Sequence, residues 1–355
     1  MSEGSIAVGA RASPLRWLFG ELPCARPAGR LLDVDAARGL AIILVVVGHV
    51  GARVATLEDA GWYVDLKAAI YLFHMPLFMA LTGITFALSL PAFTAWSEAA
   101  RFSFKRVERL LVPYVVFGLV VILGKLAASR VMHVDRPPQD LAGELYLMLV
   151  MPGSSVTVFI WFIYVVSIYL LLVPPLFRLF GRRPMLLFIA SLVLQLGEWP
   201  QLFMLDRVVE YLPFFAGGML LWMHRAAWLR IMPAVLWPAT IVFVALLVLS
   251  LWLKLPKWLV GAVSVPAVLA WMHLLAAQPQ GWLAALGRAS LAIYLMNTIA
   301  IGLAKGLMLK FLPWHGVNFL LYFPLLTLAG IALPMLVANF VKRHAPRAGR
   351  YLGAA

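Results

Sequence analysis

Long apolar runs recur along this chain of 355 residues and constrain its fold more than any other feature. Each run holds about 17–25 residues, which matches the hydrocarbon thickness of a bilayer crossed by a helix. Across the chain 63% of the residues are hydrophobic and only 12% are charged, too few for the surface of a soluble domain. We therefore predict an all-α, polytopic bundle of transmembrane helices.

The apolar runs predict about ten helices. Their expected bounds are 36–54, 68–90, 111–129, 156–177, 185–199, 208–223, 232–252, 256–276, 287–304 and 317–341. The longest polar stretch, about 130–155, is expected to form an outer loop with a half-embedded helix.

Lysines and arginines cluster in alternate inter-helix segments, such as RFSFKRVER before the third helix. The positive-inside rule then predicts that both termini lie in the cytoplasm. This divides the chain into a cytoplasmic tail over 1–30, a transmembrane domain over 31–341 and a basic cytoplasmic tail over 342–355.

The net charge of +14 suits either nucleic-acid binding or membrane insertion. Nucleic-acid binding needs a soluble basic domain, and no segment of the chain has that composition. We therefore expect membrane lipids as partners and no nucleic acid. The single Cys24 excludes an internal disulfide, and no His, Asp or Glu cluster has the spacing of metal ligands, so no metal is expected.

The first apolar run carries three polar residues, Asp35, Arg38 and His49. Eleven residues turn a helix by about 1100°, or three turns and about 20°, so Arg38 and His49 share one face and Asp35 lies close to it. Charged groups inside a bilayer normally face the bundle interior and mark a pathway or a reacting group. A helix cap at Asp35 and an arginine that reaches the lipid headgroups remain the alternative, which explains His49 less well.

The second apolar run places another imidazole at a similar depth. His49 lies about 20 Å from the inner face, and His74 lies about 9 Å from the outer face of a core about 30 Å thick. The two imidazoles are therefore expected to meet in the outer half of the bilayer. Pro76, two residues after His74, frees a backbone carbonyl beside them.

Arg106 and Arg109 stand three residues apart before the third helix and so share one face. Together with Arg38 they would place three guanidinium groups at one inner vestibule. Guanidinium binds phosphate through two parallel hydrogen bonds, so the vestibule suits a polyphosphate ligand.

Six motifs, taken in order, resemble those of the acyltransferase-3 family of integral membrane O-acyltransferases, over about residues 30–340. They are LDVDAARGLAIILVVVGH, FHMPLFMALTG, RVERLLVPY, WFIYVVSIYLLLVP, YLPFFAGGMLL and LGRASLAIYLMN. Each motif alone is weak, but the ordered set is specific.

The resemblance implies transfer of an acyl group, commonly acetyl from acetyl-CoA, to a hydroxyl of a glycan or similar acceptor. It also implies a multi-pass protein of the bacterial inner membrane. The essential histidine of the family's first helix corresponds to His49, its arginine to Arg38, and its Arg-x-x-Arg pair to Arg106 and Arg109. These arginines are the expected binding residues for the acyl donor.

Two positions depart from the family pattern: Thr82 replaces a usual serine, and Asn297 stands where many members have histidine. An amide cannot do acid–base work, so Asn297 is expected to orient a ligand or pack. We group Thr82 and Asn297 with His74 as candidates for holding the acceptor or stabilising the oxyanion.

The expected catalytic residues are His49, Arg38 and Asp35. Histidine is the side chain whose usual pKa lies near neutral pH, so His49 is expected to take the proton of the acceptor hydroxyl. A covalent acyl-histidine relay is equally compatible with the sequence. Asp35, three residues before Arg38, is expected to orient its guanidinium.

The acceptor is expected to be an envelope or exopolysaccharide glycan or a lipid-linked saccharide. The alternative function is a secondary transporter or a flippase for a lipid-linked saccharide, which would share the helices and the intramembrane charges. Transporters usually carry inverted repeats, and no repeat is found in this chain.

Overall fold

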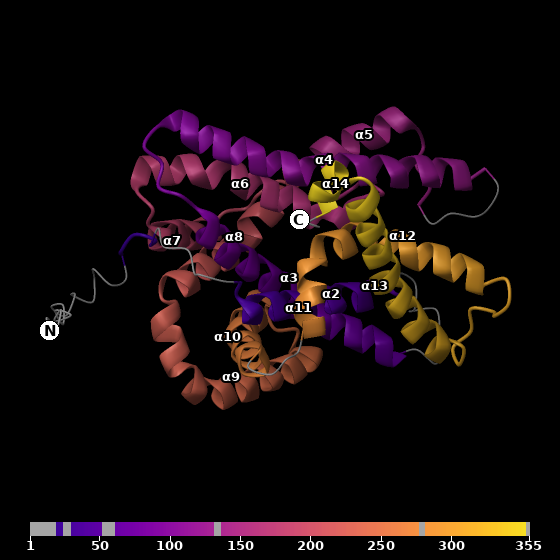
Figure 1. The fold of residues 1–355 in the computed structure, drawn as a ribbon. Coiled ribbons are helices and arrows are strands. Elements are labelled where there is room, and N and C mark those ends of the chain that lie inside the picture. The colour runs from indigo at the N-terminus through magenta and orange to yellow at the C-terminus, as the bar shows by residue number, and fades with distance from the viewer. Residues whose placement is uncertain (1–18, 24–29, 52–60, 131–135, 277–280, 353–355) are drawn as a thin grey trace, which may run out of the picture.

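The computed structural model describes residues 19–23, 30–51, 61–130, 136–276 and 281–352, and these residues form helices and connecting segments (Figure 1). The α-helices are α2 Leu32–His49, α3 Gly61–Ser89, α4 Trp96–Ala128, α5 Leu141–Val150, α6 Trp161–Phe180, α7 Pro184–Leu194, α8 Leu205–Met223, α9 Arg225–Leu253, α10 Lys257–Ala276, α11 Gly281–Arg288, α12 Ser290–Met308, α13 Phe319–His344 and α14 Pro346–Gly349. Three short 3₁₀ helices are η3 Val158–Ile160, η4 Leu202–Met204 and η5 Arg350–Leu352.

The all-α prediction is confirmed, but the count of about ten helices is wrong, because the described residues hold thirteen α-helices. Each predicted run corresponds to one helix of the structure. The three additional helices are α5, α11 and α14, which hold only 10, 8 and 4 residues. They are too short to produce an apolar run of membrane length, although α5 lies within the stretch predicted to hold a half-embedded helix.

Seven of the described helices are long and apolar enough to cross a membrane. These are α3, α4, α6 with η3, α9, α10, α12 and α13. The central helix α2 is 18 residues long, but Asp33, Asp35 and Arg38 reduce its apolar character. Such a helix is tolerated in a bilayer only when other helices surround it.

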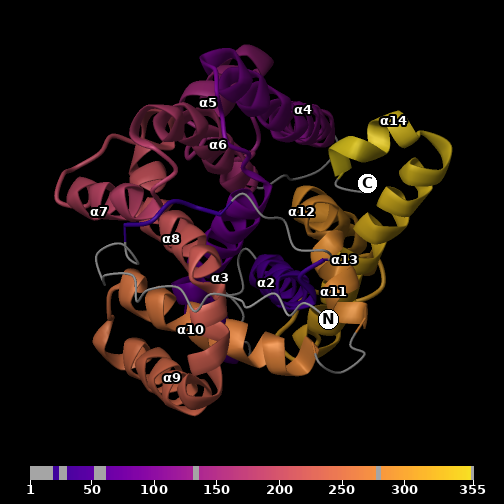
Figure 2. The same cartoon turned by 60° about the vertical axis from the view of Figure 1, so that its left-hand side comes forward.

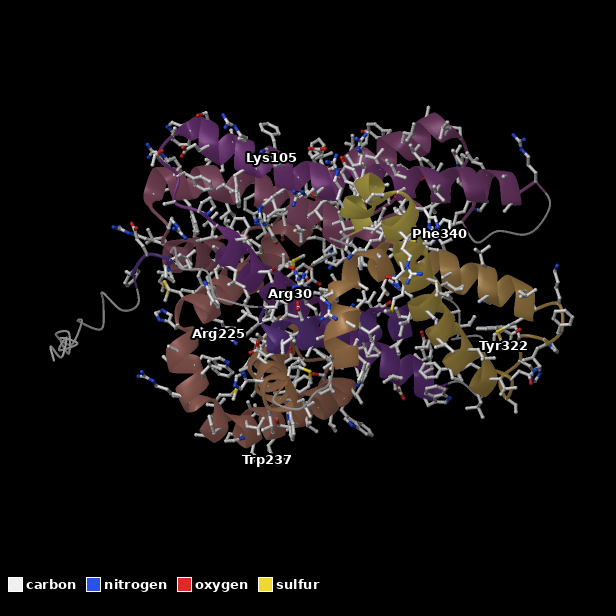
Figure 3. The ribbon with its side chains drawn as sticks, viewed as in Figure 1. Arg30, Lys105, Arg225, Trp237, Tyr322 and Phe340 are labelled. Atoms are coloured by element: carbon white, nitrogen blue, oxygen red, sulfur yellow. The ribbon has the colours of Figure 1, made fainter. Side chains whose placement is uncertain are left out.

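The polar helix α2 lies at the centre of the bundle, and α3, α10, α11, α12 and α13 contact it (Figure 2). Ten of its residues, from Asp33 to Gly48, are buried. The apolar helices take the outside: Trp237 stands on the outer edge of α9 and is 60% exposed (Figure 3). This arrangement hides charge and exposes apolar surface, as a bilayer requires.

Helix α11 crosses α2 with backbone against backbone. A Cβ atom at Gly39 would overlap the carbonyl of Leu283, and one at Gly287 would overlap the carbonyl of Asp35. Small residues permit this close approach between membrane helices. The crossing brings Arg288, at the end of α11, beside the polar end of α2.

Two helix bounds differ from the prediction in ways that affect the site. Helix α4 begins at Trp96 instead of residue 111, so the segment RFSFKRVER is helical. Beyond α13, residues 346–352 form α14 and η5, which pack against α13 and α4. We call residues 346–352 the C-terminal hook. The last residues of the first predicted helix, 52–54, lie outside the described residues.

Candidate functional site

Two cavities lie inside the bundle on either side of Tyr294. The larger cavity has a volume of about 890 Å³, and the smaller one has a volume of about 300 Å³. The hydroxyl of Tyr294 donates to the carbonyl of Phe159 (2.8 Å) and accepts from the N–H of Phe162 (3.2 Å). These two bonds hold Tyr294 against Phe159 and Phe162. Tyr294 also lines both cavities, so it forms part of their common wall.

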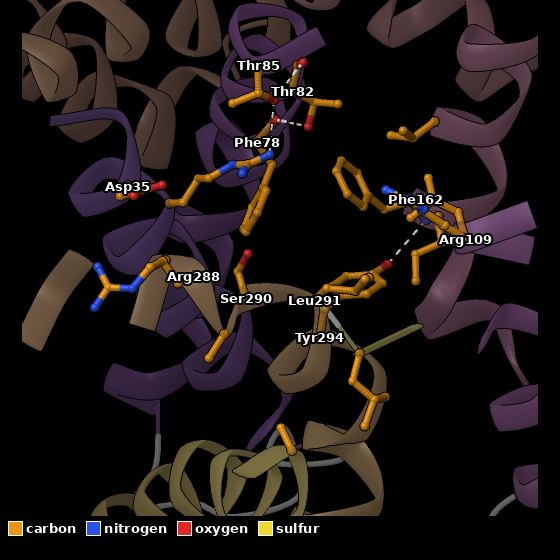
Figure 4. A pocket seen from close by; sticks show the side chains of 18 of the residues that line it. Asp35, Phe78, Thr82, Thr85, Arg109, Phe162, Arg288, Ser290, Leu291 and Tyr294 are labelled. Atoms are coloured by element: carbon orange, nitrogen blue, oxygen red, sulfur yellow. Dashed lines mark hydrogen bonds between the residues drawn. The ribbon is translucent and has the colours of Figure 1, made fainter. Parts of the chain in front are cut away.

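The larger cavity is strongly basic (Figure 4). Its described cations are Arg30, Arg38, Arg106, Arg109, Arg288, Lys342 and Arg350. Among the described lining residues, Asp35 is the one acid. A cavity of this size and charge attracts an anion with several phosphate groups, because guanidinium and phosphate match in charge and geometry.

Arg38 reaches from α2 toward α3 instead of toward Asp35. Its Nη2 donates to the hydroxyl of Thr85 at 3.1 Å, and that hydroxyl lies 3.0–3.1 Å from the carbonyls of Leu81 and Thr82. The Nε of Arg38 is buried and has no hydrogen-bond partner within the described chain. A buried guanidinium with an unused donor is prepared to bind an oxygen of a ligand.

Arg106 and Arg109 line the larger cavity from α4, as their spacing predicts. The guanidinium of Arg106 lies 4.4 Å from the ring centroid of Phe102, one turn earlier on the helix. Such stacking orients the plane of the guanidinium. Together with Arg38 these residues form the expected cluster of three guanidinium groups.

The smaller cavity contains both imidazoles, His49 and His74. The rest of its wall combines aromatic and polar side chains: Tyr71, Trp161, Gln201, Asp206, Arg207, Tyr211, Lys257 and Tyr294. The two histidines come from neighbouring helices, α2 and α3, and line this cavity together. Arg38 and His49 were expected to face one cavity; both face the interior, but they line different cavities.

The protonation of His49 follows from its contact with Asn297, 248 residues away. The Nδ2 group of Asn297 donates to the carbonyls of Ile293 (3.0 Å) and Tyr294 (2.7 Å), which leaves Oδ1 to face His49. His49 Nδ1 lies 2.8 Å from this oxygen and so carries the hydrogen of the neutral ring. The lone pair of the ring is therefore on Nε2, where it is free to accept a proton.

His74 is oriented in the same way by the main chain. Its Nδ1 lies 2.7 Å from the carbonyl of Ile70, an atom that can only accept a hydrogen bond. In the neutral ring Nε2 is then an acceptor, which suits the hydroxyl of a bound molecule and not an oxyanion. His74 is 7% exposed, and its ring packs at 5.0 Å from that of Tyr71.

The position of His49 is secured because α3 caps the end of α2. Tyr63, Lys67 and Tyr71 recur every four residues and so lie on one face of α3. Each donates to a backbone carbonyl at the end of α2 or just beyond it. The bonds run from Tyr63 to Val47 (2.8 Å), from Tyr71 to Gly48 (3.0 Å) and from Lys67 to Gly51 (3.2 Å).

Two of the residues expected to hold the acceptor lie elsewhere. Thr82 lines the larger cavity and donates to the carbonyl of Phe78 at 2.8 Å. Asn297 is fully buried behind His49 and does not line either cavity. Its position favours orientation of His49 over contact with a ligand.

At the start of α8, the sequence favoured a solvated loop around Asp206 over a site for sugar hydroxyls, and it did not single out Arg207. Arg207 pairs with Glu210 at 2.6 Å and with Asp206 at 3.8 Å, and its guanidinium lies 5.9 Å from the ring of Trp161. One carboxylate oxygen of Asp206, Oδ1, is buried without a hydrogen-bond partner among the described residues. The sequence around them resembles a solvated loop, and only packing against Trp161 reveals the site.

Asp33 was also missed. It is 6% exposed, accepts from Arg225 Nη2 at 2.7 Å and lies 3.2 Å from His273 Nδ1. These bonds tie α2 to the start of α9 and the end of α10. Asp33 is two residues from Asp35 and so lies on the other side of α2, a signal that helical periodicity offers.

Among the described residues, no group of three or more His, Cys, Asp or Glu side chains is arranged to hold a metal ion.

Comparison with known proteins shows that the family model described as Acyltransferase domain matches residues 31–339. Nodulation protein NolL of Sinorhizobium fredii (strain NBRC 101917 / NGR234) is 35% identical over 105 residues, which cover 28% of this chain and 26% of that protein. Nodulation protein NolL of Mesorhizobium japonicum (strain LMG 29417 / CECT 9101 / MAFF 303099) is 44% identical over 61 residues, or 16% of each chain.

The chain thus aligns with about a quarter or less of the length of these curated relatives. No solved structure shows significant similarity to the chain.

Proposed function

Since the chain belongs to the acyltransferase-3 family, whose model spans residues 31–339, we propose that it transfers an acetyl group from acetyl-CoA to a glycan hydroxyl. The glycan is an envelope polysaccharide, an exopolysaccharide or its lipid-linked precursor. The protein works in the bacterial inner membrane, with both termini in the cytoplasm. The larger cavity then takes the donor from the cytoplasm, and the smaller cavity takes the acceptor from the other side.

The observation that carries this proposal is the distribution of charge and basicity along α2. Arg38 faces the basic cavity, and eleven residues later His49, held through Nδ1 by Asn297, faces the other cavity together with His74. At 1.5 Å per residue the separation is roughly 16 Å. An extended pantetheine arm is of similar length, so phosphates bound near Arg38 allow the thioester to reach His49.

The donor passes Tyr294 on this path. The rings of Phe78, Phe162 and Tyr294 follow one another with centroids 5.4 Å and 5.5 Å apart, and Tyr294 lines both cavities. The thin, uncharged pantetheine arm fits between aromatic rings more easily than hydrated phosphates do. The aromatic wall thereby retains the nucleotide in the larger cavity while it admits the acyl group.

The chemical step uses His49 as a general base. Its Nε2 takes the proton of the acceptor hydroxyl while the oxygen attacks the thioester carbonyl. The tetrahedral intermediate then collapses, the carbon–sulfur bond breaks, and the imidazolium returns its proton to the departing CoA thiolate. Asn297 holds the imidazole through Nδ1 and stabilises the imidazolium with its amide oxygen.

The smaller cavity provides what a sugar acceptor needs. Trp161 and Tyr211 offer aromatic faces, with ring centroids 5.2 Å apart, and the unpaired oxygen of Asp206 offers an acceptor for a sugar hydroxyl. The Nε2 of His74 accepts from another hydroxyl. An unpaired buried carboxylate oxygen is unfavourable unless a ligand donates to it, which supports a polyhydroxylated acceptor.

The experiment that tests the function compares a deletion strain with the wild type. Proton NMR and mass spectrometry of the envelope and secreted glycans should show loss of O-acetyl groups on deletion and their return on complementation. In parallel, the purified protein in lipid nanodiscs should release CoA thiol from acetyl-CoA when the glycan is added. Unchanged acetylation, together with glycan transport by the protein in sealed proteoliposomes, would support the transporter alternative.

A further inference from the structure

The C-terminal hook is built into the wall of the larger cavity. Lys342 on α13 and Arg350 and Leu352 of the hook all line this cavity, and Leu352 is only 7% exposed. The buried Gly349 lies against the backbone of Lys342, where a Cβ atom would be 3.3 Å from its Cα. A free basic tail would show neither the buried leucine nor this close packing.

Arg350 is held in position by two partners. Its Nη2 donates to the hydroxyl of Tyr351 at 2.6 Å and lies 4.0 Å from Oε1 of Glu108 on α4. The Tyr351 hydroxyl in turn donates to the same Glu108 oxygen at 2.8 Å. Arg350 lines the cavity and is 58% exposed in its side chain, so a ligand can reach it.

The cations of the larger cavity fall into two sets by burial. Arg38 and Arg106 are half-buried, whereas the other five are exposed and surround the mouth: Arg30, Arg109, Arg288, Lys342 and Arg350. These five come from five separate parts of the chain, among them α13 and the hook. The cavity thus offers two groups of cations, one half-buried and one exposed.

We infer that the hook completes the donor site and that Arg350 and Lys342 bind a phosphate monoester, the 3′-phosphate of a coenzyme A ribose. The inference rests on the proposed function. CoA carries a diphosphate and a separate 3′-phosphate, whereas the phosphopantetheine of a carrier protein has a single phosphodiester. Two sets of cations match CoA, so the site selects free acyl-CoA over an acylated carrier protein.

The test measures the binding of CoA and of dephospho-CoA, which lacks the 3′-phosphate, to the full chain in nanodiscs by isothermal titration. We expect the wild type to bind CoA at least about tenfold more tightly, the effect of one charge-assisted contact. In Arg350→Ala and in Lys342→Ala this ratio falls toward one, and the affinity for dephospho-CoA stays unchanged. The matched control is Arg347→Ala, an exposed arginine of the hook that does not line the cavity.

A second pair of variants tests how the hook is held. Tyr351→Phe and Glu108→Gln keep every cavity cation but remove the partners of Arg350, so they should lower the same ratio by a smaller factor. A merely structural hook would weaken both ligands equally, because the 3′-phosphate would have no special partner. Unchanged dephospho-CoA binding also serves as the measure that each variant is folded.

Three results would overturn the inference. These are equal binding of CoA and dephospho-CoA by the wild type, parallel loss of both ligands in Arg350→Ala, or an Arg347→Ala variant that behaves like Arg350→Ala. Each of these results leaves acyl-CoA as the proposed donor, provided that CoA still binds. Failure of the wild type to bind either ligand would instead remove acyl-CoA as the donor and the proposed function with it.

Discussion

The two cavities lie at opposite ends of α2 and differ in their lining residues. The larger cavity, at the N-terminal end of α2, collects seven described cations and a single acid. The smaller one, at its C-terminal end, has His49 and His74, aromatic side chains and the Asp206–Arg207 pair. The first concentrates positive charge, the second combines imidazoles with aromatic and polar groups, and Tyr294 lines both.

This contrast shows how a bundle can bind a highly charged donor without exposing its base to phosphate. Near the cations, an imidazole would be held neutral by repulsion and would attract the phosphates away from their site when protonated. Separation along α2 avoids this conflict. It also leads to an expectation. Substitutions at the larger cavity should alter donor affinity, and substitutions at the smaller cavity should alter the rate or the acceptor KM.

The largest expected effect tests the base. His49→Ala should lower the rate of acyl transfer by about a hundredfold to ten-thousandfold, the usual contribution of a general base, and leave acetyl-CoA affinity unchanged. The measurement is thiol release from acetyl-CoA together with donor titration. His344→Ala is the matched control, because this imidazole lies at the end of α13 and lines neither cavity. If His49→Ala cannot bind acetyl-CoA, His49 belongs to the donor-binding site instead.

At the opposite cavity, Arg109→Ala should weaken acetyl-CoA binding by about tenfold to a hundredfold, because it removes a charge-assisted contact worth about 1.5–3 kcal/mol. The rate at saturating donor should change little. Lys105→Ala on the same helix, whose side chain stands on the outer side of α4 (Figure 3), is the control. If both variants lose the same affinity for acetyl-CoA, the effect comes from net charge. The distinction between the two cavities would then be weakened.

A smaller effect is expected where the structure supports the base from behind. Asn297→Leu removes the oxygen that accepts from Nδ1 of His49 and should lower kcat by about two- to tenfold, since one neutral hydrogen bond is worth about 0.5–1.5 kcal/mol. KM for acetyl-CoA should stay the same. A change in donor KM with kcat preserved would instead favour ligand contact by Asn297, the role expected from the sequence.

The smallest effect concerns the acceptor. Asp206→Asn should raise the acceptor KM about three- to fivefold, because an amide oxygen accepts less strongly than a carboxylate oxygen. Glu198→Gln is the matched control, since Glu198 is exposed and lines neither cavity. An unchanged acceptor KM in Asp206→Asn would mean that the smaller cavity does not recognise the sugar through Asp206. The histidines would then be the only residues of this cavity with a proposed role.

Several properties could be predicted from the sequence because they depend on neighbours along the chain. Hydropathy over about 20 residues predicted the helical class, and helical periodicity placed Arg38 and His49 on one interior-facing side of a single helix. The same periodicity placed Arg106 and Arg109 together on α4. The ordered motifs indicated the family, because they are a property of order and spacing rather than of packing.

The tertiary structure decided which distant residues meet. The contact between His49 and Asn297 joins residues 248 apart, and the glycine crossing of α11 over α2 brings Arg288 beside Asp35. Asp206 becomes part of a cavity only because α8 packs where Trp161 can reach Arg207. Such contacts depend on how helices cross, and crossing depends on side-chain shape over the whole bundle. No local pattern carries that information, so the division into two cavities and the place of the C-terminal hook required the folded chain.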